Sequence, residues 1–142
     1  MDKIKLTIIM AFGTFGSILA YLFGGWDMAL QTLIIFMGLD YLSGLVVAGV
    51  FKKSTKTENG ALESKAGWKG LVRKGMTLGI VLVGAQLDKV AGTDLIRNAV
   101  IIGYIANEAI SIIENAGLMG LPVGKVLTNA IDILKRKAER EE

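Results

Sequence analysis

Long apolar runs are the feature of this sequence that most limits its fold. They cover residues 4–23, 28–51 and 95–113, and each is close to the roughly 20 residues that a helix needs to cross the hydrocarbon core of a bilayer. The charged residues collect in a few blocks between the runs, and they do not form a polar face along each run. We therefore predict an all-α integral membrane protein.

A shorter run over residues 75–87 completes this pattern. It spans a bilayer comfortably only if residues 70–74 extend it, with Arg73 and Lys74 reaching outward to the interface. We predict about four transmembrane helices, of which the third is short. The composition agrees, because 52% hydrophobic and 20% charged residues are too apolar for an ordinary soluble domain. The first run is longer than a signal-peptide core, so we expect it to be retained.

The C-terminal part has a different pattern. The segment ENAGLMGLP at 114–122 predicts a reversal broken by glycine, and Pro122 is expected to open a last helix as its first residue. Over residues 122–138 apolar side chains recur with helical spacing, which predicts an amphipathic helix that can lie along the membrane surface. We divide the chain into a transmembrane helical domain at 1–122 and an amphipathic surface helix with a charged tail at 123–142.

Basic residues predict the orientation of the spans. With four crossings, the loop at 52–74 and both termini fall on one side, while only Lys89 and Arg97 fall opposite. Positive residues are retained in the cytoplasm, so we expect cytoplasmic N- and C-termini. The residues of the loop that set this topology are Lys52, Lys53, Lys65, Lys69, Arg73 and Lys74. The same clusters could bind an anionic lipid, whereas we expect no nucleic-acid partner.

The residue types present exclude several kinds of chemistry. The chain has no Cys and no His, so disulfides, Cys/His zinc sites and Ser-His or Cys-His nucleophile pairs are impossible. The glycines at 67 and 70 lack the spacing of a nucleotide-binding loop. We expect no enzymatic activity, no cofactor and no metal site.

Polar residues interrupt two of the apolar runs. Asp40 and Ser43 lie in the second run, and Asn107, Glu108 and Ser111 lie in the fourth. A charged side chain at the centre of a membrane helix costs about 2.5–3.5 kcal/mol, so each carboxylate should have a neighbour, a proton or water. Asp40 and Asn107 or Glu108 could meet at a similar depth, where two carboxylates tend to share a proton. These groups either join helices to each other or line a permeation path.

Glycines allow two kinds of helix packing. Gly75 and Gly79 form a G-x-x-x-G pair on one helix face, and Gly44 thins another surface. Small residues of this kind let helix backbones approach closely in a membrane. They serve either packing within one monomer or self-association into a homo-oligomer.

Three blocks of sequence resemble the phage holin family of the toxin-secretion and phage-lysis type. The blocks are DYLSG at 40–44, SKAGWKG at 64–70 and NEAISIIENAGLMGLP at 107–122, and the resemblance covers most of the chain. The positions that carry it are Asp40, Ser43, Gly44, Lys65, Gly67, Lys69, Gly70, Asn107, Glu108, Glu114, Asn115, Gly117, Gly120 and Pro122. Family members often have a second proline where this chain has Gly124.

The resemblance implies a multi-pass protein of the bacterial cytoplasmic membrane that oligomerises in the lipid bilayer. Its lesions would release an endolysin or a large toxin as cargo rather than as a tight partner. The candidates for the pore or for helix packing are Asp40, Ser43, Gly44, Gly75, Gly79, Asn107, Glu108 and Ser111. The candidates for a hinge or the surface helix are Glu114, Asn115, Gly117, Gly120 and Pro122. A small ion or proton-coupled channel or transporter is the alternative function, and a passive scaffold is a third.

Overall fold

The computed structural model describes residues 2–141, and every regular element in that range is helical. The helices are α1 (Lys3–Leu22), α2 (Met28–Val46) with its π-helical continuation η1 (Val47–Phe51), α3 (Ser64–Ala91), α4 (Leu95–Leu118) and α5 (Lys125–Glu141). Within the described range, α1, α2 with η1, α3 and α4 are the four helices long and apolar enough to cross a membrane. The predicted all-α class with four candidate spans is confirmed.

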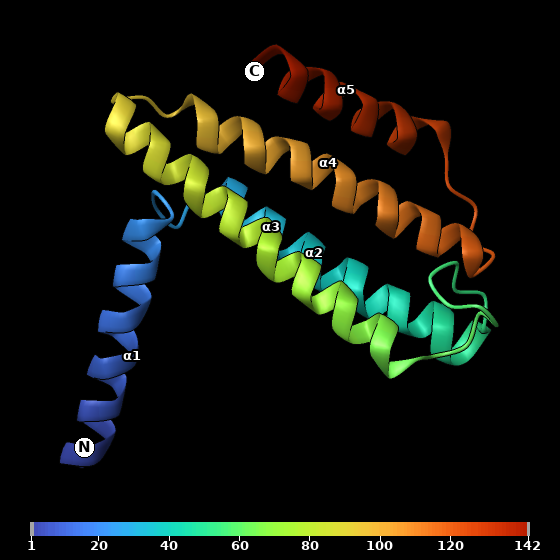
Figure 1. The fold of residues 1–142 in the computed structure, drawn as a ribbon, viewed down its shortest axis with the longest axis horizontal. Coiled ribbons are helices and arrows are strands. Elements are labelled where there is room, and N and C mark those ends of the chain that lie inside the picture. Colours follow the sequence, from blue (N-terminus) through green and yellow to red (C-terminus); the bar gives the residue numbers. More distant parts are fainter. Residues whose placement is uncertain (1, 142) are drawn as a thin grey trace.

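Helices α2, α3 and α4 lie side by side as a bundle (Figure 1). Helices α2 and α4 run in the same direction and α3 runs against them, while α5 returns along α4. We call the end of the bundle with residues 23–27 and 92–94 the distal end. The end with residues 52–63 and 119–124 is the basic end. Helix α1 leaves the bundle at the distal end and points away from it (Figure 1).

The bundle core follows the helical spacing of the apolar residues. Leu30, Leu33 and Met37 recur on one face of α2 and pack against Val81 of α3 and two isoleucines of α4 at 101 and 105. Asp27 begins α2 as its N-cap, where its side chain accepts a hydrogen bond from the backbone N–H of Leu30 at 3.0 Å. The register of α2 against its neighbours is thus set at its first turn.

The expectation that the third helix is short is wrong, because α3 has 28 residues and begins at Ser64. Residues 64–74, which the composition assigns to a polar connection, are its first turns. Glycine disfavours a helix, but Gly67 and Gly70 here leave room for the ring of Tyr41, whose hydroxyl donates to the Gly67 carbonyl at 3.3 Å. Packing across helices thus overrides the local preference, and the connecting loop is confined to residues 52–63.

The reversal after α4 also differs from the prediction. Helix α4 continues to Leu118, so Glu114, Asn115 and Gly117 lie within it. The turn is made at Gly120, whose φ of +87° requires glycine, and the next N–H returns to the Ala116 carbonyl at 3.0 Å. Pro122 is not the first residue of the last helix, which begins at Lys125 after Gly124.

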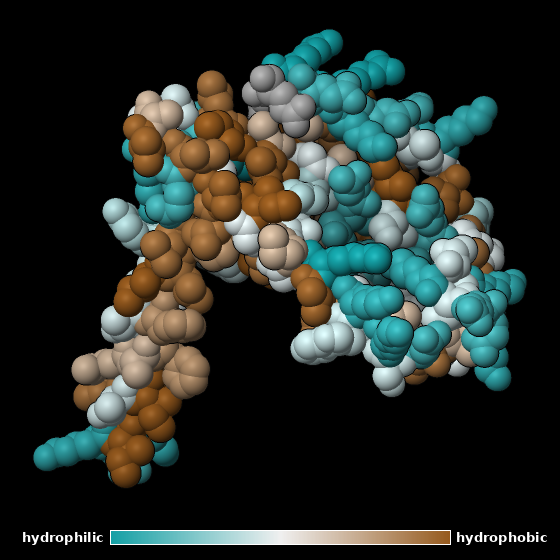
Figure 2. Space-filling view, viewed as in Figure 1, coloured by the Kyte–Doolittle hydropathy of each residue, from teal (hydrophilic) through white to brown (hydrophobic). Residues whose placement is uncertain are grey.

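Helix α1 has no buried residue. Its apolar side chains face outward on every side, and Figure 2 shows this hydrophobic column standing apart from the bundle. A helix that is apolar all round is stable in lipid or against other helices, not in water. An open cleft of about 620 Å³ separates α1 from the bundle and includes Gly16, Leu30 and Leu78 in its walls.

Helix α5 packs along α4 with part of its apolar residues inward, while Leu127 and Ile133 stay exposed. Ile131 and Ala138 are buried, and Leu134 contacts the edge of the core. Its charged residues point away from the bundle, where Figure 2 shows a hydrophilic surface. The amphipathic pattern of the sequence is therefore present in the structure. A position of this helix on a membrane surface stays a prediction.

Candidate functional site

A buried ionic cluster joins the three helices of the bundle. The Lys74 ammonium of α3 lies 2.6 Å from Asp40 Oδ2 of α2 and 2.6 Å from Glu108 Oε2 of α4. The side chains of Lys74, Asp40 and Glu108 are only 15%, 6% and 12% exposed. The prediction that the carboxylates of Asp40 and Glu108 lie at a similar depth agrees with this contact. Lys74 bridges the two carboxylates, whereas we predicted that they share a proton.

Asn115 extends this cluster along α4. Its side-chain amide donates to the Asp40 carbonyl at 3.3 Å, to Asp40 Oδ1 at 3.2 Å and to Ser43 Oγ at 2.8 Å. Ser43 in turn donates to the Asp40 carbonyl at 3.0 Å. A β-carbon at Gly44 would lie 3.8 Å from the Asn115 amide nitrogen, which is an ordinary contact distance, so Gly44 faces α4 beside the cluster. We call Asp40, Ser43, Lys74, Glu108 and Asn115 the charged cluster.

The charged cluster carries one net negative charge at neutral pH, because two carboxylates share one ammonium. Asp40 is 13 positions from Asp27 at the distal end, which places it about 20 Å along the bundle. This depth lies inside an about 30 Å hydrocarbon core, where polar groups are expensive and pair with one another. No three His, Cys, Asp or Glu side chains within residues 2–141 form a metal-binding group.

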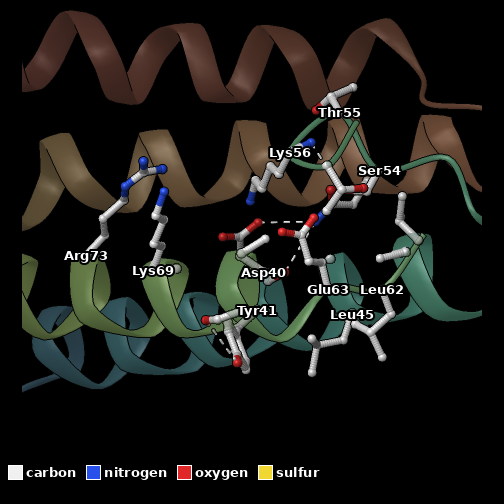
Figure 3. Close-up of a pocket in the computed structure, with 18 of the residues that line it drawn as sticks. Asp40, Tyr41, Leu45, Ser54, Thr55, Lys56, Leu62, Glu63, Lys69 and Arg73 are labelled. Atoms are coloured by element: carbon white, nitrogen blue, oxygen red, sulfur yellow. Dashed lines mark hydrogen bonds between the residues drawn. The ribbon is translucent and has the colours of Figure 1, made fainter. Parts of the chain in front are cut away.

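A cavity of about 460 Å³ opens from the basic end toward the charged cluster. Its walls come from η1, the loop at 52–63 and the first turns of α3, and Asp40 and Glu108 lie at its inner end. In Figure 3, Lys69 and Arg73 extend from α3 into this space, and Lys56 reaches from the loop toward Asp40. The charged cluster is therefore connected to the basic end of the molecule by a polar passage.

A second polar group closes the distal end. Arg97 of α4 is 5% exposed, and its two terminal nitrogens contact the Asp27 carboxylate at 2.7 and 3.1 Å. The same guanidinium donates to the carbonyls of Phe23 and Gly25. The Arg97 hydrogen bonds hold the pKa of Asp27 below its ordinary value of 3.8. We call this arrangement the distal clamp, because it attaches the end of α1 to α4.

Helix α3 completes the distal clamp. Gln86 donates to the Leu22 carbonyl at 2.7 Å, and Lys89 donates to the Tyr21 carbonyl at 2.6 Å. Asp88 accepts the backbone N–H groups of Ile96 and Arg97, at 3.1 and 2.8 Å, and so caps the start of α4. The last two carbonyls of α1 thus accept hydrogen bonds from side chains of α3, and Arg97 of α4 binds the carbonyls of the turn that follows.

Several residues predicted from the sequence lie outside the charged cluster. Asn107 is exposed, although its neighbour Glu108 is inside. Ser111 differs from these residues, because it is partly buried on the same face of α4 as Glu108 and Asn115 and its side chain lies beside the Asp40 carboxylate. A β-carbon added at Gly75 would have no neighbouring atom within 4 Å, and one added at Gly79 would contact only Met76 of the same helix. The following predicted residues are exposed: Lys52, Lys53, Lys65, Lys69, Arg73, Glu114, Gly117, Gly120 and Pro122.

The expectation that Lys74 reaches outward to the interface is wrong, because its ammonium points into the bundle between Asp40 and Glu108; sequence reasoning treated Lys74 as an end residue of the third span. A helix from Ser64 places Lys74 inside the bundle, so the long α3 was the signal needed. Arg97 was used only to count charges, although Asp27 and Asp88 stand near the ends of the flanking helices. Asn115 was predicted as a hinge residue. Its spacing of seven residues from Glu108 places both on one helix face.

Comparison with known proteins gives consistent results. The family model described as the bacteriophage holin family matches residues 17–136. An uncharacterized protein of Listeria monocytogenes is 40% identical over 96% of this chain and 94% of its own length. An uncharacterized 14.9 kDa protein of Clostridium perfringens is 36% identical over 96% of this chain and 99% of its own length. A probable holin of Bacillus phage phi105 is 28% identical, with coverage of 87% and 88%. No solved structure matches the chain.

Proposed function

Since the chain belongs to the bacteriophage holin family, we propose that it assembles in the bacterial cytoplasmic membrane and opens lesions that release an endolysin or a large toxin. The family and the four candidate spans support a membrane protein with a holin role. The observation that carries the finer proposal is the charged cluster, which places two carboxylates and one ammonium within the span of the helices.

The charged cluster supports a closed state that is held together by its own charges. Lys74 offsets the two carboxylates only in part, and the remaining negative charge stays costly while Asp40 and Glu108 are only 6% and 12% exposed. Rearrangement of several copies around a water-filled opening would hydrate Asp40 and Glu108 and remove this cost. Interfaces of this kind exchange between discrete arrangements, which fits an abrupt opening better than a gradual leak.

Helix α1 supports assembly with further copies. Its exposed apolar surface and the small residues Gly13, Gly16 and Ser17, which line the cleft beside it, suit close helix contact in lipid. This face of α1 has open space in the monomer, since a β-carbon added at Gly13 or Gly16 would have no atom within 4 Å. We propose that α1 contacts other copies and that the distal clamp keeps it attached to its own bundle during this exchange.

The orientation proposed is the one that the charges predict. The N- and C-termini and the basic end face the cytoplasm, and the distal clamp faces outward. Helix α5 serves as an amphipathic surface helix on the cytoplasmic side. The cargo passes through the lesion and is not bound tightly, and the mechanism requires no catalytic step.

Inducible expression in a bacterium tests this proposal. Culture density, membrane potential and release of a large cytoplasmic reporter enzyme are followed after induction. A holin stops growth abruptly and releases the enzyme, whereas a channel or transporter passes only small solutes and a scaffold does neither. Glu108→Gln should shift the time of onset, while Asn107→Gln, a change to an exposed neighbour, should leave it unchanged. Growth that continues with no enzyme release would contradict the proposal.

A further inference from the structure

We propose that the cavity at the basic end binds the phosphate group of an anionic phospholipid from the surrounding leaflet. Four exposed cations, Lys56, Lys65, Lys69 and Arg73, line this cavity. None of them forms an ion pair with a carboxylate in the described part of the chain. The carboxylates in the lining are Asp40, Glu63 and Glu108, and Lys74 already contacts two of them. The cavity therefore has a surplus of positive charge.

The cations converge because of their spacing. Lys65, Lys69 and Arg73 recur every four residues, so they form one stripe on α3. Figure 3 shows Lys69 and Arg73 pointing into the cavity and Lys56 entering it from the opposite wall. Thr55 adds a hydroxyl group to the lining, whereas the Thr57 hydroxyl already donates to the Ala61 carbonyl at 2.9 Å. Cationic and hydroxyl donors around one space are the groups that hold a phosphate.

The start of α3 adds a further donor region. The first backbone N–H groups of a helix lack partners inside the helix and carry partial positive charge. The N-cap residue Glu63 makes no side-chain cap bond there, and Glu63, Lys65 and Ala66 all line the cavity. The same wall therefore offers fixed amide groups beside the mobile side chains.

The level of the cavity along α3 favours a lipid over a free ion. With 28 residues, α3 is about 42 Å long and exceeds an about 30 Å hydrocarbon core by about 12 Å. The surplus belongs to its first turns, because these carry the cations and the exposed Trp68, a residue typical of the membrane interface. Lys65 and Lys69 then lie at the level of the lipid phosphates, and Arg73, about 14 Å from the start of α3, lies at the edge of the hydrocarbon core, from which its long side chain reaches the same level.

The lining of the cavity also fits an amphiphilic ligand. Leu45, Leu62 and Leu118 form apolar parts of its wall. These can contact the glycerol and the first methylene groups of a lipid, for which a free phosphate ion has no equivalent. This inference concerns ligand binding by the closed protein, and it holds whether or not the assembled protein opens lesions.

Ligand binding by the purified full-length protein in a non-ionic detergent tests the inference. Native mass spectrometry and thermal unfolding are measured with phosphatidylglycerol, phosphatidylcholine and sodium phosphate in separate titrations. The test variant is Lys69→Gln with Arg73→Gln, two exposed positions whose change should not affect folding. The control variant is Lys135→Gln with Lys137→Gln, which loses the same charge from exposed positions of α5 outside the cavity.

We expect the wild type and the control to bind phosphatidylglycerol in preference to phosphatidylcholine. Two basic residues near an anionic headgroup together contribute about 25-fold to affinity, so the test variant should bind phosphatidylglycerol about 25-fold more weakly. An equal loss of affinity for phosphatidylglycerol in the test and control variants would indicate a general effect of positive charge and would overturn the inference. Stabilisation by sodium phosphate equal to that by phosphatidylglycerol would overturn the lipid as the source of the phosphate.

Discussion

The substitution Lys74→Met removes the ammonium that contacts both carboxylates of the charged cluster and keeps an unbranched side chain of similar length. The Lys74 side chain is 15% exposed, and those of Asp40 and Glu108 are 6% and 12% exposed. Both carboxylates lose their charged partner at once. The variant therefore tests whether the charges of the cluster, rather than its packing alone, hold α2, α3 and α4 together.

The magnitude follows from the burial of the cluster. Removing one partner of a buried ion pair costs about 3–5 kcal/mol, because the remaining charge is left uncompensated. The compensated triple variant Lys74→Met, Asp40→Asn and Glu108→Gln carries no charge at these positions. Replacing a whole buried ionic group by well-packed hydrophobic residues of similar volume is often neutral or stabilising. Asn and Gln keep the shape of the two acids without their charge, so the cost of uncompensated charge is removed. We therefore expect the triple variant to recover at least about 3 kcal/mol, or about 100-fold in the unfolding equilibrium.

The assay is reversible unfolding in mixed micelles, followed by the fluorescence of Trp26 and Trp68. Lysis timing after induction gives a second measurement. Under the proposed mechanism the single variant weakens the closed state and should trigger earlier than the wild type. The triple variant has no carboxylate to hydrate in the open state and should trigger later. The change Lys137→Met, at an exposed position of α5 outside the cavity, controls for the loss of a lysine.

Two results would refute this reasoning. If the single and triple variants are destabilised equally, the loss comes from packing and not from uncompensated charge. If Lys74→Met unfolds at the same denaturant concentration as the wild type, Lys74 does not offset the carboxylates in the folded protein. If lysis begins at the same time in the single and triple variants, the charges of the cluster do not control the opening step.

The remaining predictions concern helix contacts and the distal clamp. Gly84→Val should reduce stability by about 1–3 kcal/mol, because an added β-carbon lies 3.3 Å from the α4 backbone. Gly75→Val, which has open space around it, should not destabilise the purified monomer. Equal unfolding temperatures of the two variants would contradict this difference in helix packing. Asp27→Asn keeps a good N-cap but loses the ion pair to the arginine of α4. The pKa of Asp27 is lowered in the folded state, so its contribution is complete above the ordinary value of 3.8 and disappears as the pH falls through the folded-state pKa. The difference in unfolding temperature from the wild type should therefore vanish in acid, and it should correspond to no more than about 1 kcal/mol at neutral pH, because half of this side chain is exposed. The pair Gly103→Cys and Ala138→Cys tests whether α5 must separate from α4 before the protein opens, and it should form a disulfide in detergent, since the two β-carbon positions are 3.9 Å apart. The oxidised protein should fail to release dye from vesicles, and reduction should restore the release. Equal dye release in the oxidised and reduced states would contradict the need for this separation.

The class of fold was predictable because membrane spans depend on length and apolarity, which are local properties of the sequence. The boundaries were less predictable, because distant contacts decide them. The start of α3 at Ser64 depends on the Tyr41 ring packing over Gly67 and Gly70, and nothing near these glycines in the sequence indicates that contact. The end of α4 at Leu118 was missed because the whole segment 114–122 was taken as the reversal, whereas the helix continues to Leu118 and the left-handed residue is Gly120.

The charged cluster was predictable only in part, because its acids are evident from the sequence but their contacts depend on how the helices pack. An acid inside a span needs a partner, so Asp40 and Glu108 could be selected without a structure. Their partner could not, because the position of Lys74 depends on where α3 begins. The exposed Asn107 and the buried Asn115 show a second limit, since only the rotation of α4 against α2 decides which amide faces Asp40.

The contact between α4 and α5 connects this closed bundle to the membrane. The outward residues of α5 include the cations Lys125, Lys135, Arg136, Lys137 and Arg140. Immersing these charges in hydrocarbon would cost on the order of 10 kcal/mol, since each costs about 2.5–3.5 kcal/mol at the centre of a bilayer. Burial of Ile131, Leu134 and Ala138 against α4 offsets only about 1.5–3 kcal/mol for each large side chain. Helix α5 can therefore lie along α4 while that face of α4 is in water. Once lipid surrounds α4, the favourable position for the same apolar stripe is the membrane surface, and the face of α4 that α5 leaves becomes available to another helix.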